Sequence, residues 1–219
     1  MFKLNTLVLI GGSGTNLQYM IDGCDNGFLD IEIQAVISHN PEAYGLVRAE
    51  QAQIPALTVD HRAFKNRAEF ESQLARVIGT FEPDLIVLAG FMRILSAEFI
   101  HPYLGKIINI HPSRLPDYPG LNTHKKVLEA KNKIHGATVH YVTSQLDGGP
   151  IIAQTTIDVE ENDTESSLKA KVQLTEYDLY PKVIQWFAEH RLHLDNNVVY
   201  FDEQPLPQTG IQLNNETAN

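Results

Sequence analysis

Residues 106–120 read KIINIHPSRLPDYPG and are the most informative part of this chain. The β-branched run 107–110 predicts a buried strand, and three prolines favour a stiff, extended loop after it. Asn109 and His111 are two positions apart, so both side chains face one side of an extended strand. An amide that can donate to an oxyanion and an imidazole that can carry a proton suit acyl transfer. A strand-end histidine bonded to the backbone would give the same pattern, and this segment alone leaves that alternative open.

Predicted strands and helices alternate on both sides of this segment. Apolar runs predict strands at 6–10, 33–38, 55–59 and 85–89, with helices at 43–53, 97–100 and 123–130. This alternation indicates an α/β protein with a doubly wound, mainly parallel sheet. The segments 137–142 and 151–159 predict an antiparallel pair. A long helix, capped by Asp163 or Thr164, should then reach residue 187.

The chain shows no internal repeat and no linker, so we expect one domain over residues 1–203. Residues 204–219 are polar and contain two prolines. We expect them to form a flexible tail.

Three segments should follow the carboxyl ends of parallel strands, where ligands bind in such sheets. The first, GGSGTN at 11–16, precedes a helix, where glycine amides and the helix N-terminus favour a phosphate. It matches neither the dinucleotide fingerprint nor the P-loop, and a plain tight turn is the alternative. The second, GFMRIL at 90–95, can line a slot for a flat ring or belong to the core. The third is the proline-rich segment 111–120, which begins with His111.

Asp147, in the sequence LDGGP, lies in a glycine-rich loop between the two antiparallel segments. A carboxylate beside a histidine would orient the ring and favour its protonated form. An ordinary Asp-Gly turn is the simpler interpretation of this sequence taken alone.

Composition narrows the classes of function. The 219 residues include 17 Lys and Arg against 27 Asp and Glu, and the net charge of −10 argues against extended nucleic-acid binding. The one cysteine, Cys24, excludes a disulfide framework and suggests a reducing, cytoplasmic setting. The apolar run at 7–10 is too short for a membrane span, so we expect no membrane partner. No metal is expected, and His135, His140 and His190 are interpreted as structural or surface groups.

The motifs GGSGTNLQ, LAGFMRIL, NIHPSRLPDYPG, HGATVHYV and LDGGPI, in this order and spacing, resemble those of the phosphoribosylglycinamide formyltransferases. The resemblance covers residues 7–201. It implies a Rossmann-like formyltransferase fold with C-terminal antiparallel strands and a long helix. It also implies transfer of the formyl group of 10-formyl-tetrahydrofolate to the amine of 5-phosphoribosylglycinamide in purine biosynthesis. The reaction would be a direct attack through a tetrahedral intermediate.

The resemblance further implies roles for single residues. Asn109, His111 and Asp147 match the catalytic trio, with the proton passing through His111 or a water held by Asp147. The positions that match substrate-binding residues are Gly14, Thr15, Asn16 and Glu176. Those that match folate-binding residues are Arg67, Met92, Arg93, Ile94, Leu95, Asn109 and Val142. The family often has Ser in place of Thr15 and His in place of Asn122.

Three alternatives remain at this point. Methionyl-tRNA formyltransferases and formyl-folate hydrolases share the catalytic segment. Against the first, the acidic chain offers no basic tRNA-binding domain; against the second, it offers no added N-terminal regulatory region. A non-catalytic folate-binding protein would not need Asn109, His111 and Asp147 together. We therefore expect small-molecule substrates and no nucleic-acid partner, while the oligomeric state stays open.

Overall fold

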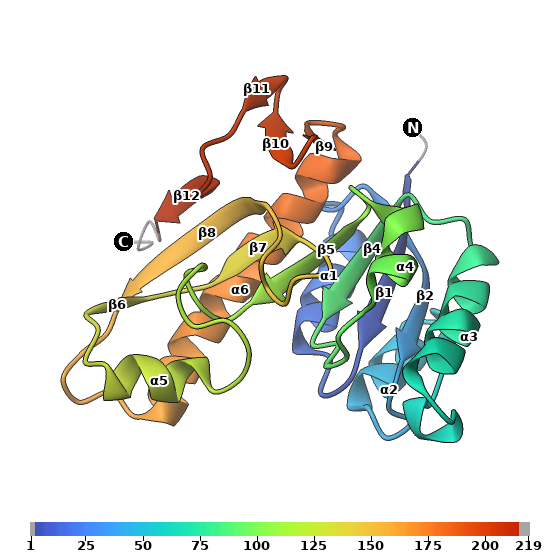
Figure 1. The fold of residues 1–219 in the computed structure, drawn as a ribbon, viewed down its shortest axis with the longest axis horizontal. Helices are drawn as coiled ribbons and strands as arrows, with labels where there is room; N and C mark the ends of the chain where they lie inside the picture. Colours follow the sequence, from blue (N-terminus) through green and yellow to red (C-terminus); the bar gives the residue numbers. More distant parts are fainter. Residues whose placement is uncertain (1–2, 215–219) are drawn as a thin grey trace.

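A nine-stranded central sheet organises the computed structural model, which describes residues 3–214 (Figure 1). Five strands are parallel and stand in the order β3-β2-β1-β4-β5. Their bounds are β3 Ala56–Thr58, β2 Ile31–Ser38, β1 Leu4–Ile10, β4 Leu85–Ala89 and β5 Ile107–His111. The strand order 3-2-1-4-5 confirms the doubly wound, mainly parallel sheet that the sequence predicts.

The sheet continues beyond β5 with a different pattern. The additional strands are β6 Ile134–His135, β7 Thr138–Tyr141, β8 Ile151–Asp158 and β12 Ile211–Asn214. β7 runs antiparallel to β5 and to β8, as predicted, and β6 also pairs with β8. The register places Asn109 opposite His140, and His111 opposite Thr138.

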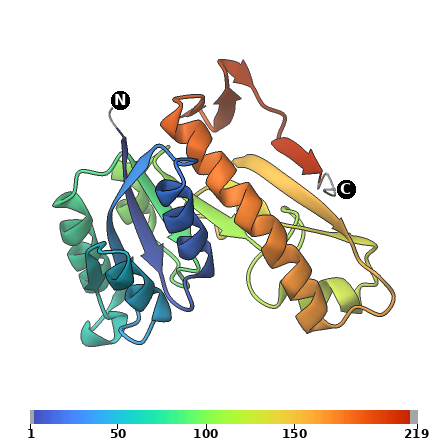
Figure 2. The same cartoon turned by 180° about the vertical axis from the view of Figure 1, so that it is seen from behind.

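Helices cover both faces of this sheet (Figures 1 and 2). One face carries α1 Thr15–Asp25, α2 Tyr44–Gln51 and α6 Glu165–Ala188; the other carries α3 Arg67–Gly79 and α4 Ala97–Ile100. Alternate residues of β1 supply the two cores, Val8 and Ile10 toward α1 and α6, Leu7 and Leu9 toward α3. The remaining helical segments are η1 His61–Ala63, η2 His101–Tyr103 and α5 Thr123–Glu129. No helix within residues 3–214 is long and apolar enough to cross a membrane.

The long helix α6 begins with a reciprocal cap. The Thr164 hydroxyl accepts from the Ser167 N–H at 3.1 Å, and the Ser167 hydroxyl accepts from the Thr164 N–H at 2.9 Å. Of the two capping residues that the sequence allows, Thr164 is therefore the one used. Asp163 instead accepts from the Ser167 hydroxyl and from Lys171. The helix then continues through Pro181 to Ala188.

The C-terminal region differs from the flexible tail expected at 204–219. Within the expected tail, β11 Gln204–Pro205 pairs with β10 Val198–Phe201, and β12 adds an edge strand to the main sheet. β10 also pairs with β9 Leu192–Asp195, and these two strands precede the tail and are among the C-terminal antiparallel strands that the resemblance implies. Ile211 and Leu213 pack against the core, while backbone pairing with β8 supplies most of the remaining contact. Such an edge strand needs few apolar residues, which is why composition did not reveal it. Residues 215–219 of the expected tail lie outside the described residues.

Gly136 and Gly79 provide a matched test of this packing. A Cβ at Gly136 would lie against the backbone carbonyl of Thr155 in β8, whereas a Cβ at Gly79 would meet nothing within 4 Å. Gly136→Ala should lower the free energy of unfolding by about 1–3 kcal/mol, because the β6–β8 contact must open. Gly79→Ala should leave it unchanged or raise it by up to about 1 kcal/mol. Urea unfolding measures both, and equal effects would contradict the close approach of the two backbones at Gly136.

Candidate active site

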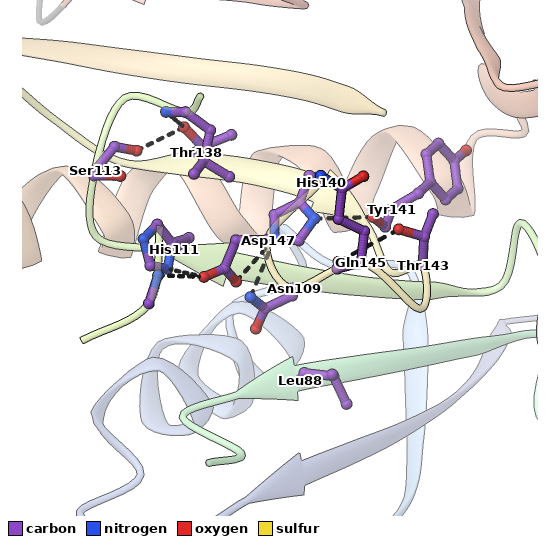
Figure 3. A network of polar contacts seen from close by, with 12 residues as sticks. Leu88, Asn109, His111, Ser113, Thr138, His140, Tyr141, Thr143, Gln145 and Asp147 are labelled. Atoms are coloured by element: carbon purple, nitrogen blue, oxygen red, sulfur yellow. Dashed lines mark hydrogen bonds and ion pairs between the residues drawn. The ribbon is translucent and has the colours of Figure 1, made fainter. Parts of the chain in front are cut away.

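Strand β5 presents Asn109 and His111 on one face of the sheet. Ile108 and Ile110 alternate with them and are buried in the core on the opposite face, against which α6 packs. Figure 3 shows the Asn109 and His111 side chains on the same side of the strand, with Asp147 close to both. The structure thus brings together the three residues that the sequence singled out for catalysis.

His111 is held between a carboxylate and the proline loop. Its Nε2 donates to the Tyr118 carbonyl at 2.9 Å, and its Nδ1 lies 3.4 Å from Asp147 Oδ2. The Gly120 N–H donates to the same Asp147 oxygen at 2.8 Å. Both ring nitrogens therefore face oxygens that accept hydrogen bonds, so the Tyr118 carbonyl and the Asp147 carboxylate together hold the orientation of the ring.

The loop that carries Asp147 turns tightly against β7. Asp147 has a left-handed backbone with a φ of 48°, and a Cβ at Gly149 would collide with the Tyr141 carbonyl. Only glycine fits this approach of the chain to β7. The tight return projects the Asp147 carboxylate toward His111.

His140 is a further member of this cluster. Its Nε2 lies 3.2 Å from Asn109 Nδ2 and 3.9 Å from Asp147 Oδ1. Of the two interpretations open from the sequence, a structural or a surface group, burial and the bond to Asn109 agree with the structural one. Its position opposite Asn109 follows from the β5–β7 register, which the sequence does not specify.

The glycine loop leads into the start of α1, where no side chain caps the backbone N–H groups of the first turn. Gly14 is the N-cap residue with a φ of 69°, and no side chain caps this helix end. Gly14 also lies directly against Gly45 of α2, where a Cβ would come within 2.6 Å of the Gly45 Cα. The first-turn N–H groups of α1 and the helix dipole suit an anion at Gly14, Thr15 and Asn16.

Helix α6 reaches this loop with two polar side chains. Gln173 Nε2 donates to the Thr15 hydroxyl at 3.1 Å, and Asn16 Nδ2 donates to Glu176 Oε2 at 3.0 Å. Asn16 Oδ1 is buried without a hydrogen-bond partner among the described residues. Sequence reasoning missed Gln173; the available signal was its position three residues before Glu176, on the same helix face.

Glu176 is buried, and burial raises the pKa of its carboxyl to about 7. The hydrogen bond from Asn16 and the charge of Lys169 oppose this increase. A carboxyl group with this pKa changes its charge near neutral pH.

The segment after β4 exposes apolar side chains beside the catalytic strand. Phe91 and Leu95 are buried anchors, whereas Met92 is 67% exposed and Ile94 is 56% exposed, with Arg93 also exposed between them. Solvent-exposed apolar side chains at the end of a strand indicate a binding site for an apolar ring.

Arg67 begins α3, and Val142 is the first residue after β7, where its N–H donates to the Ile107 carbonyl at the start of β5. Arg67, the first residue of α3, donates from Nε to Glu71 Oε1 at 2.7 Å. Glu71 is buried and also accepts from the Ser96 N–H at 2.8 Å, which ties α3 to the segment that ends at Leu95. Val142 is partly buried against the α3 side of the core.

A cavity of about 1000 Å³ lies between the Asp147 loop, α4 and the C-terminal segment. Residues 143–145 and Asp147 line it, but residues 92–95 do not. The slot predicted at residues 90–95 is therefore not this cavity. Among the residues that the structure describes, no group of three His, Cys, Asp or Glu side chains could hold a metal ion.

Glu176→Gln should remove a pH dependence of stability. The folded protein holds the Glu176 proton more tightly than the unfolded chain does, with a pKa of about 7 against 4.5. The resulting stabilisation is complete below pH 4.5 and is lost as the pH rises through 7, by on the order of 2 kcal/mol. Denaturant unfolding between pH 5 and 8 measures it, and the exposed Glu165→Gln in the same helix is the control. A wild-type curve parallel to that of Glu176→Gln would contradict the expectation.

Comparison with known proteins supports the motif resemblance. Residues 4–184 match the family model described as formyl transferase. The chain is 45% identical over 207 residues to a phosphoribosylglycinamide formyltransferase of Escherichia coli K12, covering 94% of this chain and 98% of that one. It is 40% identical over 195 residues to the human trifunctional purine biosynthetic protein adenosine-3, covering 89% of this chain and 19% of that longer one. A solved phosphoribosylglycinamide formyltransferase from Coxiella burnetii superposes with a TM-score of 0.94 at 48% identity, over 96% of this chain and 99% of that one. With its motifs, fold and relatives in agreement, the chain belongs to the formyl transferase family.

Proposed function

We propose that this protein transfers the formyl group of 10-formyl-tetrahydrofolate to the amine of 5-phosphoribosylglycinamide, a reaction of purine biosynthesis. The observation that carries the proposal is the cluster of Asn109, His111 and Asp147 at the end of β5. Relatives that match nearly the full chain are phosphoribosylglycinamide formyltransferases, which favours this acceptor within the family.

The residues of the cluster suit each part of the transfer. A bond forms between the acceptor amine and the formyl carbon, the bond from that carbon to the folate nitrogen breaks, and one proton moves from amine to folate nitrogen. Asn109 Nδ2 donates to the oxyanion that develops on the formyl oxygen. The proton passes through His111, whose charged form Asp147 stabilises, or through a water that Asp147 holds.

The acceptor spans neighbouring strand ends. β1, β4 and β5 are adjacent, so the glycine loop and the catalytic strand open on the same edge of the sheet. In this proposal the phosphate binds at Gly14, Thr15 and Asn16, and its amine reaches His111. Gln173, Glu176 and the unpartnered Asn16 Oδ1 face the part of the acceptor that lies between.

The folate ring binds beside the segment that follows β4. Met92, Arg93, Ile94 and Leu95 border it on one side and Val142 on the other, with Arg67 at the entrance. The exposed apolar side chains of Met92 and Ile94 support this assignment.

A small acceptor also agrees with the charge of the chain. A tRNA acceptor requires several cations that neutralise backbone phosphates, and this chain has a net charge of −10. One phosphate can instead be held by the amides of a single glycine loop. The cytoplasmic location expected from the single cysteine is part of the same proposal.

His111→Ala should lower kcat by about 10² to 10⁴, the range for loss of a group that transfers a proton. The KM values for both substrates should change little, because His111 acts on the proton and not on binding. The assay follows the folate absorbance change with 5-phosphoribosylglycinamide as acceptor. His193→Ala removes a partly exposed histidine of β9 as the control. Activity of His111→Ala within about tenfold of wild type would reject the assignment.

The efficiency of formyl transfer, measured as kcat/KM, should depend on the phosphate of the acceptor. Dephosphorylated glycinamide riboside should show a kcat/KM at least about 10²-fold lower than the phosphorylated acceptor, because the glycine-loop amides lose their anion. Methionyl-tRNA should not be formylated at any salt concentration. The three acceptors are compared in one assay. Equal use of both glycinamides would remove the glycine loop from the site, and salt-sensitive formylation of methionyl-tRNA would overturn the proposed acceptor.

A further inference from the structure

His140 faces Asn109 across the β5–β7 pair and is almost completely buried. Its side chain comes from the middle of β7, and the residue is 2% exposed. Its Nδ1 lies 2.9 Å from the backbone carbonyl of Tyr141, and its Nε2 lies 3.2 Å from Asn109 Nδ2 (Figure 3). Both ring nitrogens thus have one close polar neighbour each.

These two contacts fix the tautomer of the ring. A backbone carbonyl can only accept a hydrogen bond, so Nδ1 carries a proton and donates it to the Tyr141 carbonyl. Burial lowers the pKa of His140, which keeps the ring neutral with a single N–H. Nε2 therefore has a lone pair and no proton.

The tautomer in turn fixes the orientation of the Asn109 amide. An unprotonated Nε2 needs a donor, and Asn109 Nδ2 supplies it. If the amide were rotated by 180°, Asn109 Oδ1 would face the Nε2 lone pair, and two acceptors would oppose each other in a buried place. Such an arrangement leaves both buried acceptors without a donor and is avoided in proteins.

We infer that His140 is a positioning residue that holds the Asn109 amide in the orientation required for formyl transfer. The inference rests on the proposed catalytic role of Asn109. With one N–H of Nδ2 bonded to His140, the other remains on the side of His111 and Asp147, where the oxyanion would form. Two consecutive hydrogen bonds, from Asn109 Nδ2 to His140 Nε2 and from His140 Nδ1 to the Tyr141 carbonyl, therefore fix the orientation of the Asn109 amide before substrate binds.

Nitrogen NMR tests the bond itself without an activity measurement. In ¹⁵N-histidine-labelled protein, His140 should have a protonated Nδ1 and an unprotonated Nε2 at neutral pH, and Asn109→Ala should shift the Nε2 signal. The signals are assigned by their loss in His140→Gln. A protonated Nε2, or an Nε2 signal that does not respond to Asn109→Ala, would overturn the inference.

Steady-state kinetics test whether the His140–Asn109 hydrogen bond affects formyl transfer by way of Asn109. His140→Leu should lower kcat by about 10- to 10²-fold, with the KM values within about threefold of wild type, because a misplaced catalytic group slows the chemical step. His140→Gln should recover most of this loss, since its amide oxygen can accept from Asn109. In the Asn109→Ala background, His140→Leu should change kcat by less than about twofold. If His140→Leu lowers kcat by the same factor in the Asn109→Ala background as in the wild type, the inference is rejected.

Val139→Ala provides the matched control for a loss of packing. Val139 is the neighbour of His140 in β7, is fully buried, and belongs to the core on the opposite face. This variant should be less stable but should keep the wild-type kcat. A near-wild-type kcat for Asn109→Ala would reject the catalytic role of Asn109 and thus the proposed function. The NMR result would still decide whether His140 orients the amide.

Discussion

The antiparallel pairing of β5 with β7 is the contact on which the candidate site depends. It places Asn109 opposite His140 and His111 opposite Thr138, and it sets the Asn109 and His111 side chains on the face away from α6. Side chains alternate along a strand, so a shift of one residue would turn Asn109 and His111 into the core. Ile108 and Ile110, which alternate with them, oppose such a shift because they would then leave the core. The geometry of the candidate site is thus stabilised by the same apolar burial that stabilises the sheet.

The proline loop after β5 is fastened to this pairing through one hydroxyl. Thr138 Oγ1 donates to the Ser113 carbonyl and accepts from the Leu115 N–H and from Gln154 Nε2. Gln154 also donates to the Leu115 carbonyl, and both side chains are buried. A buried network whose members are all satisfied has one arrangement and few alternatives. It holds the loop that provides the Tyr118 carbonyl to His111 and the Gly120 N–H to Asp147, so these partners are in place before any ligand binds.

The sequence allowed the main elements and much of the site to be predicted, because these depend on short-range patterns. The apolar runs of β1, β4 and β5 and the glycines of the first loop are local signals, and the structure has them where expected. The contact of His140 with Asn109 was not predicted because it depends on the register of β5 against β7, which no local pattern specifies. Gln173 was missed because its contact with Thr15 depends on how α6 packs on α1, although its spacing from Glu176 was a local signal. β12 was missed for the converse reason, since an edge strand is stabilised by backbone pairing that leaves little trace in composition. The resemblance to a known family, rather than periodicity, indicated Glu176 and Arg67.

The strand β12 has a consequence for how the chain reaches its folded state. β8 is eight residues long, and its outer edge is paired by residues that come more than fifty positions later in the chain. During synthesis that edge therefore remains an open template for other strands until residues 211–214 have left the ribosome. Once β12 docks, the middle of that edge, residues 153–156, is paired, and the new edge that β12 presents is only four residues long. The last described segment of the protein thus protects it from self-association.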